Sequence, residues 1–218
     1  MTPAPAPHVP ALGHDWLTPV YDAVAWLAGE RAIKRHLVAE ARIAPGQDVL
    51  DLGCGTGTLA LLVKRAHPGA RMIGLDVDER ILAIARRKLA RAGVDVPLHR
   101  ASATAPPFRP ASFDRILSTL VLHHLTTDEK RRVFAAVRSL LRPGGELHVA
   151  DWGRPQNVVM RLAAGTVAWF DGADRLAANL RGELPILAAA AGLVAVEETA
   201  HWMTPFGTLT FLRAAAPS

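Results

Sequence analysis

The chain has 218 residues, half of them apolar, with a net charge of +5 and a pI of about 10.1. This length allows one large domain or two small ones, and the apolar content is ample for a core. Charged residues or glycines break every apolar run before it reaches membrane-spanning length. A single cysteine excludes an intrachain disulfide and a cysteine-based metal cluster, so we expect a cytoplasmic protein.

The positive charge raises the question of an anionic partner, either nucleic acid or a membrane surface. The arginines lie mainly on the faces of expected helices, as in Arg86-Arg-Lys88 and Lys130-Arg-Arg132. We therefore expect no nucleic acid. Peripheral contact with a membrane and the oligomeric state stay open.

The N-terminal part divides into a tail and a helical region. Residues 1–13 are rich in proline and alanine and have neither the basic start nor the apolar segment of a signal peptide, so we expect a flexible tail. Residues 14–42 have helical patterning, with Ile33, Leu37 and Val38 on one side. We expect residues 14–218 to form one domain, in which 14–43 are a helical lid.

The stretch from Val49 to Gly57 reads Val-Leu-Asp-Leu-Gly-Cys-Gly-Thr-Gly. It predicts a buried strand interrupted by Asp51, then a turn, then a helix beginning at Thr58. Glycine at alternate positions permits positive φ values and lets the backbone approach a ligand closely. A strand, a glycine turn and a helix in this order are typical of a ligand-binding site.

The remaining elements alternate between strand and helix patterns. Strands are expected at 71–76, 96–100, 113–118, 146–151, 193–199 and 208–213. Helices are expected at 78–92, at 128–141 with a stop at Arg142-Pro-Gly-Gly145, and over 155–191 with a break near 170–174. This order predicts an α/β fold, a mostly parallel sheet with helices on both faces. The last two strands, joined by a loop through Trp202 and Pro205, suit an antiparallel edge hairpin.

Two acidic residues narrow the ligand. Asp51 lies in the strand before the turn, and Asp76 ends the second strand, where a carboxylate can accept hydrogen bonds from ribose hydroxyls. The glycines are spaced G-x-G-x-G, one residue shorter than the dinucleotide fingerprint. No lysine follows the last glycine as in a phosphate-binding loop, so we expect a ribose-bearing cofactor.

These motifs, with Ser112-Phe-Asp114, Leu122-His-His124 and Leu141-Arg-Pro-Gly-Gly145, resemble the class I S-adenosylmethionine-dependent methyltransferases. The resemblance is greatest to the group of ubiquinone/menaquinone biosynthesis methyltransferases, and it runs from about Trp16 to Asp151. It implies a Rossmann-like sheet of seven strands, with S-adenosylmethionine bound across the carboxyl ends of the first strands.

The resemblance also implies cofactor contacts. The glycines would pass under the methionine part, Asp51 would support the loop and the ammonium, and Asp76 would hold the ribose. The full set of implied cofactor-binding residues is Asp51, Gly53, Gly55, Gly57, Asp76, Val77, Ser102, Ala103, Ser118 and Tyr21, with Leu120 beside Ser118. Family members usually have Gly-Asp-Ala beside the adenine, whereas this chain has Ala101-Ser-Ala103. A serine hydroxyl forms a weaker hydrogen bond with the adenine amino group than an aspartate carboxylate does.

The acceptor side carries candidates for catalysis. His124, His123 and Tyr21 are candidate catalytic residues, since a phenol or hydroxyl acceptor needs a base, and histidine is suited to that task near neutral pH. Each also has a structural interpretation: hydrogen bonding to the backbone for the histidines, and packing for Tyr21. We expect residues 152–191 to be a helical substrate cover that includes Arg161, Trp169, Phe170 and Asn179. Asp151 and Trp152 contact the substrate or cap the loop, and Cys54 is expected only to be small.

We therefore expect methyl transfer from S-adenosylmethionine to a small apolar or aromatic acceptor, such as a quinone-type ring, a phenol, a lipid amine or a thiol. One alternative is a cofactor-binding regulatory protein on the same fold. Another is methylation of RNA or DNA, but the Asn/Asp-Pro-Pro-Tyr motif of amino-group base methyltransferases is absent from the fourth strand, which ends Leu117-Ser-Thr-Leu120.

Overall fold

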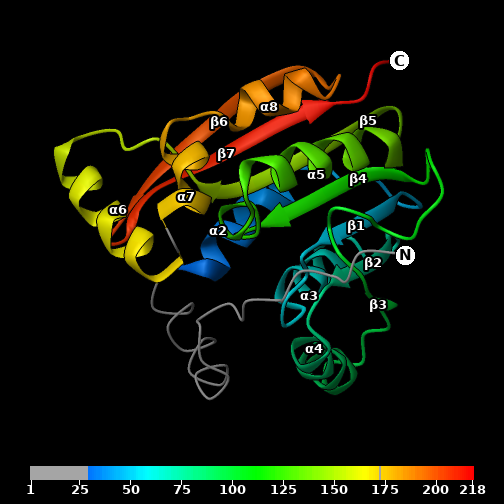
Figure 1. The fold of residues 1–218 in the computed structure, drawn as a ribbon. Coiled ribbons are helices and arrows are strands. Elements are labelled where there is room, and N and C mark those ends of the chain that lie inside the picture. Colours follow the sequence, from blue (N-terminus) through cyan, green and yellow to red (C-terminus); the bar gives the residue numbers. More distant parts are fainter. Residues whose placement is uncertain (1–28, 172) are drawn as a thin grey trace, which may run out of the picture.

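The structure is a computed structural model that describes residues 29–171 and 173–218, without the side chains of 165–171 and 173. The predicted tail, the first half of the predicted lid and Tyr21 lie outside the described residues. Within them, the chain folds around one mixed sheet with helices on both sides (Figure 1).

The sheet has seven strands in the order β3-β2-β1-β4-β5-β7-β6. Its strands are β1 (Asp48–Leu52), β2 (Arg71–Asp76), β3 (Leu98–Arg100), β4 (Phe113–Thr119), β5 (Leu141–Trp152), β6 (Val194–Thr204) and β7 (Gly207–Ala215). The pairs among β1 to β5 are parallel, while β7 is antiparallel to both β5 and β6. The predicted fold class, including the antiparallel edge hairpin, is confirmed.

The helices cover the two faces of the sheet. One face carries α2 (Glu30–Glu40), α3 (Thr58–Ala66) and α4 (Glu79–Arg91), and the other carries α5 (Thr127–Leu140) and α8 (Leu184–Ala190) (Figure 1). Successive residues of a strand point to opposite faces, so Val49 packs with the first group of helices and Leu50 with the second. Both residues are fully buried. Near-continuous apolar strands are what a sheet covered on both faces requires.

Side-chain caps define two of the helix starts. The Asp78 carboxylate accepts a hydrogen bond from the amide of Arg80 at 2.8 Å and caps α4. Thr126 and Glu129 form a reciprocal capping box at the start of α5. Caps of this kind typically contribute about 1 kcal/mol each, and they fix where each helix leaves the edge of the sheet.

Two predicted boundaries were wrong. The fifth strand begins at Leu141 rather than at Glu146, because Leu141 pairs with Phe113 and the ladder resumes after a register shift. Trp202 lies in β6, opposite Leu209, and not in a loop. In both places pairing with a distant strand extends a segment whose local sequence indicates a turn.

Residues of two family motifs hold the amino-terminal edge of the sheet. Asp114 accepts hydrogen bonds from the amide of Asp48 at 2.8 Å and from Arg142 at 2.6 Å. Asp48 also binds Arg71 and Arg142 at 2.6–2.8 Å. These ion pairs hold the pKa of Asp48 below its usual value, the hydrogen bond from Arg71 contributing most. This edge is structural, and the candidate site lies at the opposite, carboxyl edge.

Candidate functional site

The glycine loop connects β1 to α3 at the carboxyl edge. Gly53, Gly55 and Gly57 have φ values of +78°, +52° and +76°, a region that side chains with a Cβ rarely adopt. The amides of Gly53 and Cys54 both donate to the carbonyl of Leu75 at 2.8 and 2.9 Å, which ties the loop to the end of β2. These two backbone hydrogen bonds fix the start of the loop at the end of β2.

The three glycines meet different surroundings. A Cβ on Gly53 would lie 2.2 Å from Val121 Cγ2, and one on Gly57 would lie 3.2 Å from the Cβ of Ala85 on α4. These two glycines are needed for packing. A Cβ on Gly55 would meet no described atom within 4 Å. Gly55 therefore borders open space at the carboxyl edge, as a cradle for a ligand requires.

Asp76 joins the end of β2 to this cradle. Its Oδ2 accepts a hydrogen bond from the amide of Gly55 at 2.9 Å, and its Oδ1 accepts one from the amide of Asp78 at 3.1 Å. A carboxylate has about four acceptor positions, so two remain for a ligand. Vicinal ribose hydroxyls are donors of the kind that this carboxylate can accept.

Asp51 is fully buried beneath the loop, and neither of its carboxylate oxygens has a hydrogen-bond partner of normal geometry among the described residues. Burial raises the pKa of Asp51 to about 7, against the opposing effect of the Lys34 ammonium and with a further rise from the Asp76 carboxylate. The backbone amide of Ala60 also lowers the pKa of Asp51, although it does not form a hydrogen bond of normal geometry with the carboxylate. A buried carboxylate with unused acceptor positions suits a cationic ligand group.

Two lysines near the loop were missed by the sequence analysis. Lys88 of α4 donates to the hydroxyls of Thr56 at 2.7 Å and Thr58 at 3.0 Å, which braces the loop from outside. Lys34 of α2 is buried and bonded to Glu30. The threonines flanking Gly57 could have indicated a polar brace, but which lysine provides it depends on the packing of α4.

The implied adenine-binding residues lie along the same edge, after β2 and β3. Val77 is 43 % exposed, which is unusual for a valine beside a buried strand. The Ser102 hydroxyl bonds to the Thr104 hydroxyl at 2.8 Å and accepts from the Thr104 amide. Ala103 packs on the core beneath. An apolar surface and a hydroxyl pair are thus present where the resemblance implies the purine.

The end of β4 completes the site. Ser118 is buried, and its hydroxyl donates to the Leu52 carbonyl at 2.9 Å, so it fixes β4 to β1. Leu120 has φ +56°. This conformation costs a residue with a Cβ roughly 1–2 kcal/mol. Such strain is found where a site needs a particular backbone direction.

Asp151, at the end of β5, organises the turn that follows Leu120. Its Oδ2 accepts from the amides of Val121 and Leu122 at 3.0 and 2.7 Å. Its Oδ1 lies 2.8 Å from Nδ1 of His123, and also accepts from the Trp152 amide at 2.7 Å and from Asn179 at 3.2 Å. Despite complete burial, the His123 ring and these donors hold the pKa of Asp151 below its usual value. Asp151 is therefore a capping residue, which favours the structural interpretation of His123.

The two histidines differ in environment. His123 is 4 % exposed, whereas His124 is partly exposed and its ring centroid lies 3.9 Å from that of His123. Beneath them, burial lowers the pKa of Lys130 to about 8. Lys130 donates to the carbonyls of Leu125 and Arg175, joining the 3₁₀ turn η2 (Leu122–His124) to α7 (Ala173–Leu180). Of the two rings, only that of His124 is partly exposed.

Some predicted residues are not placed at the site. Nothing is described of Tyr21 or of the side chains of Trp169 and Phe170. Arg161 is exposed, and Asn179 is buried against Asp151 rather than facing an open space. Cys54 is buried, and burial raises the pKa of its thiol, in agreement with a purely spatial role.

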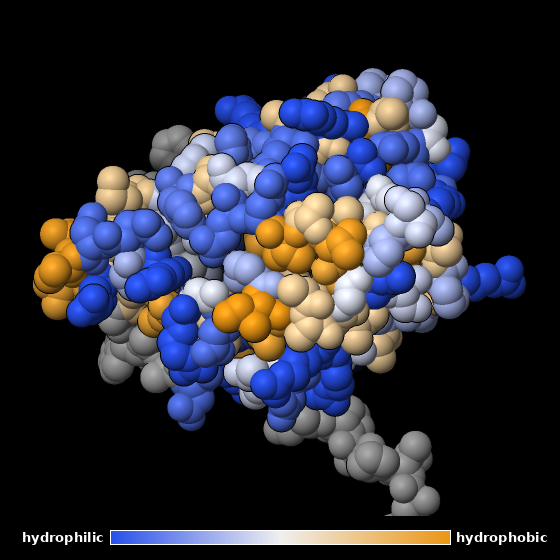
Figure 2. Space-filling model, turned by 90° about the horizontal axis from the view of Figure 1, so that it is seen from above, coloured by the Kyte–Doolittle hydropathy of each residue, from blue (hydrophilic) through white to orange (hydrophobic). Residues whose placement is uncertain are grey.

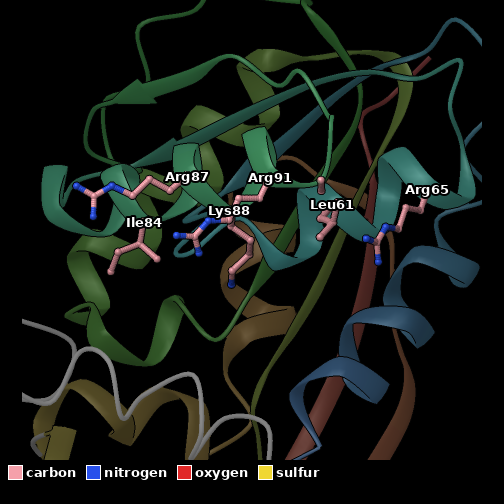
Figure 3. A pocket seen from close by; sticks show the side chains of 7 residues that line it. Leu61, Arg65, Ile84, Arg87, Lys88 and Arg91 are labelled. Atoms are coloured by element: carbon pink, nitrogen blue, oxygen red, sulfur yellow. The ribbon is translucent and has the colours of Figure 1, made fainter.

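A second feature, a basic groove of about 490 Å³, lies between α3 and α4. Figure 3 shows Arg87, Lys88 and Arg91 of α4 along one wall, with Leu61 and Arg65 of α3 opposite. It lies on the helical face and not at the carboxyl edge. No set of side chains suited to a metal ion occurs within the described residues, nor does any described helix have the length and apolarity to cross a membrane.

Residues 49–145 match the family described as a methyltransferase domain. These residues form a methyltransferase domain. The chain is 34 % identical over 141 residues to a ubiquinone/menaquinone biosynthesis C-methyltransferase of Bordetella avium, covering 64 % of this chain and 53 % of that one. It is 37 % identical over 107 residues to a demethylmenaquinone methyltransferase of Thermus thermophilus, 49 % of this chain and 48 % of that one. It thus spans about half the length of these two curated relatives.

The fold is shared with solved methyltransferases. Phosphoethanolamine N-methyltransferase 2 of Haemonchus contortus, solved with S-adenosylmethionine, superposes with a TM-score of 0.74 at 17 % identity, covering 96 % of this chain and 59 % of that one. Similarity at this identity concerns the fold alone. Together the comparisons agree with the predicted methyltransferase domain, and the cofactor present in that solved structure is the one that the sequence predicts for this chain.

The methyltransferase domain has the groups that this cofactor needs. The partnerless carboxylate of Asp51 matches an ammonium group, and the open space beside Gly55 matches a ligand lying on the loop. The unused acceptor positions of Asp76 match ribose hydroxyls. Of these features, the buried carboxylate of Asp51 is the one that is costly in a purely structural loop.

Proposed function

We propose that this chain transfers a methyl group from S-adenosylmethionine to a small apolar or aromatic acceptor, with a quinone-type ring carbon as the leading class. The feature that supports cofactor use most strongly is the cradle at Gly55, flanked by the carboxylates of Asp51 and Asp76. The curated relatives, named for quinone methylation, support the acceptor class.

The cofactor supplies an electrophilic methyl group on a sulfonium, and the residues of the chain have to align the acceptor with it and exclude water. In this proposal Asp76 holds the ribose of the cofactor and Asp51 its ammonium end, and Gly55 lets the cofactor lie close to the loop. The strained backbone at Leu120 and the turn capped by Asp151 position His124 on the acceptor side.

His124 has a defined task if the acceptor is a phenol or hydroquinone. Its imidazole would take the hydroxyl proton, which raises the electron density of the ring and favours attack on the methyl group. A thiolate acceptor would need no such base. Loss of turnover on replacement of His124 by alanine is therefore expected for a phenol or hydroquinone and not for a thiolate.

Mutation of Asp76 tests the cofactor assignment. Asp76→Ala should weaken S-adenosylhomocysteine binding by at least about tenfold, since charge-assisted hydrogen bonds contribute about 1.5–3 kcal/mol. The measurement is calorimetry, with Asp95→Ala, at an exposed site after α4, as the matched control. A deoxyribose analogue should bind the wild type less tightly than S-adenosylhomocysteine does. The Asp76→Ala variant should bind the two molecules with about equal affinity. Equal affinity of wild type and Asp76→Ala would contradict the assignment.

Turnover tests the enzyme itself. A panel of a short-chain hydroquinone, a phenol, an ethanolamine and a thiol would be assayed for release of S-adenosylhomocysteine. Methylation of the hydroquinone at carbon is the expected result. Tight cofactor binding without turnover on any acceptor would favour a regulatory protein on this fold.

A further inference from the structure

Helix α6 (Val158–Asp171) has apolar residues on two opposite faces of its first turns. Met160 and Ala164 point into the protein and are 8 % and 4 % exposed. Val158, Val159 and Leu162 are 69 %, 67 % and 74 % exposed. A helix that is apolar all round usually lies in a protein core or against a membrane. The outer face of α6 therefore requires an explanation beyond folding.

The turn between β6 and β7 extends this apolar surface. Met203 is 66 % exposed and Phe206 is 39 % exposed. Asn157, just before α6, donates to the sulfur of Met203 at 3.4 Å, and a Cβ on Gly207 would lie 3.6 Å from Ala164. Figure 1 places α6 and this turn at the same end of the molecule, and Figure 2 shows apolar side chains gathered at that end. We call Val158, Val159, Leu162, Met203 and Phe206 the apolar tip.

The chain segment that leads into α6 and forms its first turns is positively charged. Residues 152–170 contain no aspartate or glutamate, and the segment carries Arg154 and Arg161, both exposed. Arginines beside exposed valine and leucine are the composition of helices that lie in the interface of an anionic bilayer. If two copies of the chain met at this surface, the arginines of one copy would face those of the other, and this segment has no acidic residue to pair with them. Such a contact is therefore less favourable than one with an anionic surface.

The apolar tip lies at the carboxyl edge of the sheet. β5 ends at Trp152, and five residues separate it from the start of α6 at Val158. Trp152 pairs with Leu209, close to the β6–β7 turn. The candidate site is at the same edge. A surface in contact with the tip would therefore adjoin the route by which an acceptor reaches the cofactor.

We propose that the apolar tip docks on an anionic lipid bilayer, with its valines and leucine among the acyl chains and Arg154 and Arg161 at the headgroups. The role of this contact, transfer of an apolar acceptor from the bilayer to the site, rests on the proposed function. The contact itself rests on the surface alone. Docking on the bilayer extends the proposed function, because it names the bilayer as the source of the acceptor.

Vesicle cosedimentation of the full chain tests the contact. The wild type should bind phosphatidylcholine vesicles that contain phosphatidylglycerol more tightly than those of phosphatidylcholine alone. Val158→Asp/Leu162→Asp should reduce binding by at least about tenfold, because each aspartate replaces apolar burial by a charge in the interface. Ile186→Asp on α8, at a residue 66 % exposed, is the matched control and should bind like the wild type.

A second variant tests the charge without adding an acid. Arg154→Gln/Arg161→Gln should lose the preference for anionic vesicles while keeping weak binding to both kinds. All variants should keep the wild-type affinity for S-adenosylhomocysteine and its thermal midpoint, which excludes loss of fold as the cause.

Several results would overturn the inference. The wild type could fail to bind anionic vesicles, or the tip variant could bind as well as the wild type. Loss of binding with Arg87→Glu/Arg91→Glu in the basic groove, but not with the tip variant, would move the contact to α4. Light scattering that shows a wild-type dimer and a monomeric tip variant would make the tip a protein interface. Vesicle binding without turnover of a water-soluble hydroquinone would refute the proposed function and leave the docking surface standing.

Discussion

Replacement of Asp51 by asparagine should separate folding from cofactor binding. The pKa of Asp51 is raised to about 7 from 3.8, chiefly by burial. At 1.36 kcal/mol per pKa unit, the buried charge costs the folded protein up to about 4 kcal/mol at pH 8. An asparagine amide without a partner costs about 1–3 kcal/mol. Asp51→Asn should therefore leave the cofactor-free protein at least as stable, or stabilise it by about 1–3 kcal/mol.

The sign of the pH dependence follows from the same shift. Because the folded-state pKa lies above the unfolded one, the proton on Asp51 stabilises the fold fully below about pH 3.8. That contribution is lost as the pH rises through about 7. The stability advantage of Asp51→Asn should therefore be largest at pH 8 and should shrink toward pH 5.

Cofactor binding should change in the opposite direction. The ammonium of S-adenosylhomocysteine would compensate the charge of Asp51, so Asp51→Asn should weaken binding by about tenfold or more. Wild-type binding should release a proton near pH 7, detectable by calorimetry in buffers of different ionisation enthalpy.

Urea unfolding and calorimetry check this prediction, with Asp48→Asn as the control. Asp48 is paired with Arg71 and Arg142, so its loss should destabilise the fold by up to about 1 kcal/mol at pH 8 and leave cofactor affinity unchanged. An Asp51→Asn variant that is clearly less stable than the wild type at pH 8, and binds S-adenosylhomocysteine equally well, would refute the reasoning.

Three further predictions address the rest of the site. Gly55→Ala and Gly93→Ala both place a Cβ at positive φ in open space and should each cost about 1 kcal/mol in urea, but only Gly55→Ala should weaken S-adenosylhomocysteine binding. His124→Ala should lower kcat more than cofactor affinity, and a wild-type rate that is constant from about pH 6 to 9 would exclude it as the base. Asp151→Asn removes the charge that holds His123 and should lower the unfolding free energy by about 2–4 kcal/mol, so a wild-type thermal midpoint would contradict its capping role.

The sequence predicted the fold well where its signals are local. Glycine at alternate positions after an apolar strand identified the loop, because glycine readily adopts positive φ. The periodicity of apolar residues predicted the order of strands and helices. It failed at Arg142-Pro-Gly-Gly145 and at Trp202, where pairing with a distant strand overrides turn-forming residues.

The sequence indicated which of the candidate residues lie side by side. Asp51, Gly55 and Asp76 lie together at the carboxyl edge, as parallel strands with a shared edge require. The sequence could not show that Asp151 caps the turn after β4, since that depends on β5 lying beside β4. It also could not show which histidine is tied to a carboxylate, because His123 and His124 are neighbours in sequence and differ only in the direction of their side chains.

By itself, then, the sequence determined the class of fold and the class of cofactor, because both follow from short-range conformational limits on glycine and from residues at strand ends. Only the tertiary structure decided the hydrogen-bond partners, packing contacts and exposure of individual residues. Examples are the unsatisfied carboxylate of Asp51, the close approach of Gly53 to Val121, and the exposed face of α6. These depend on atoms brought together from distant segments, and burial and packing are properties of that assembly.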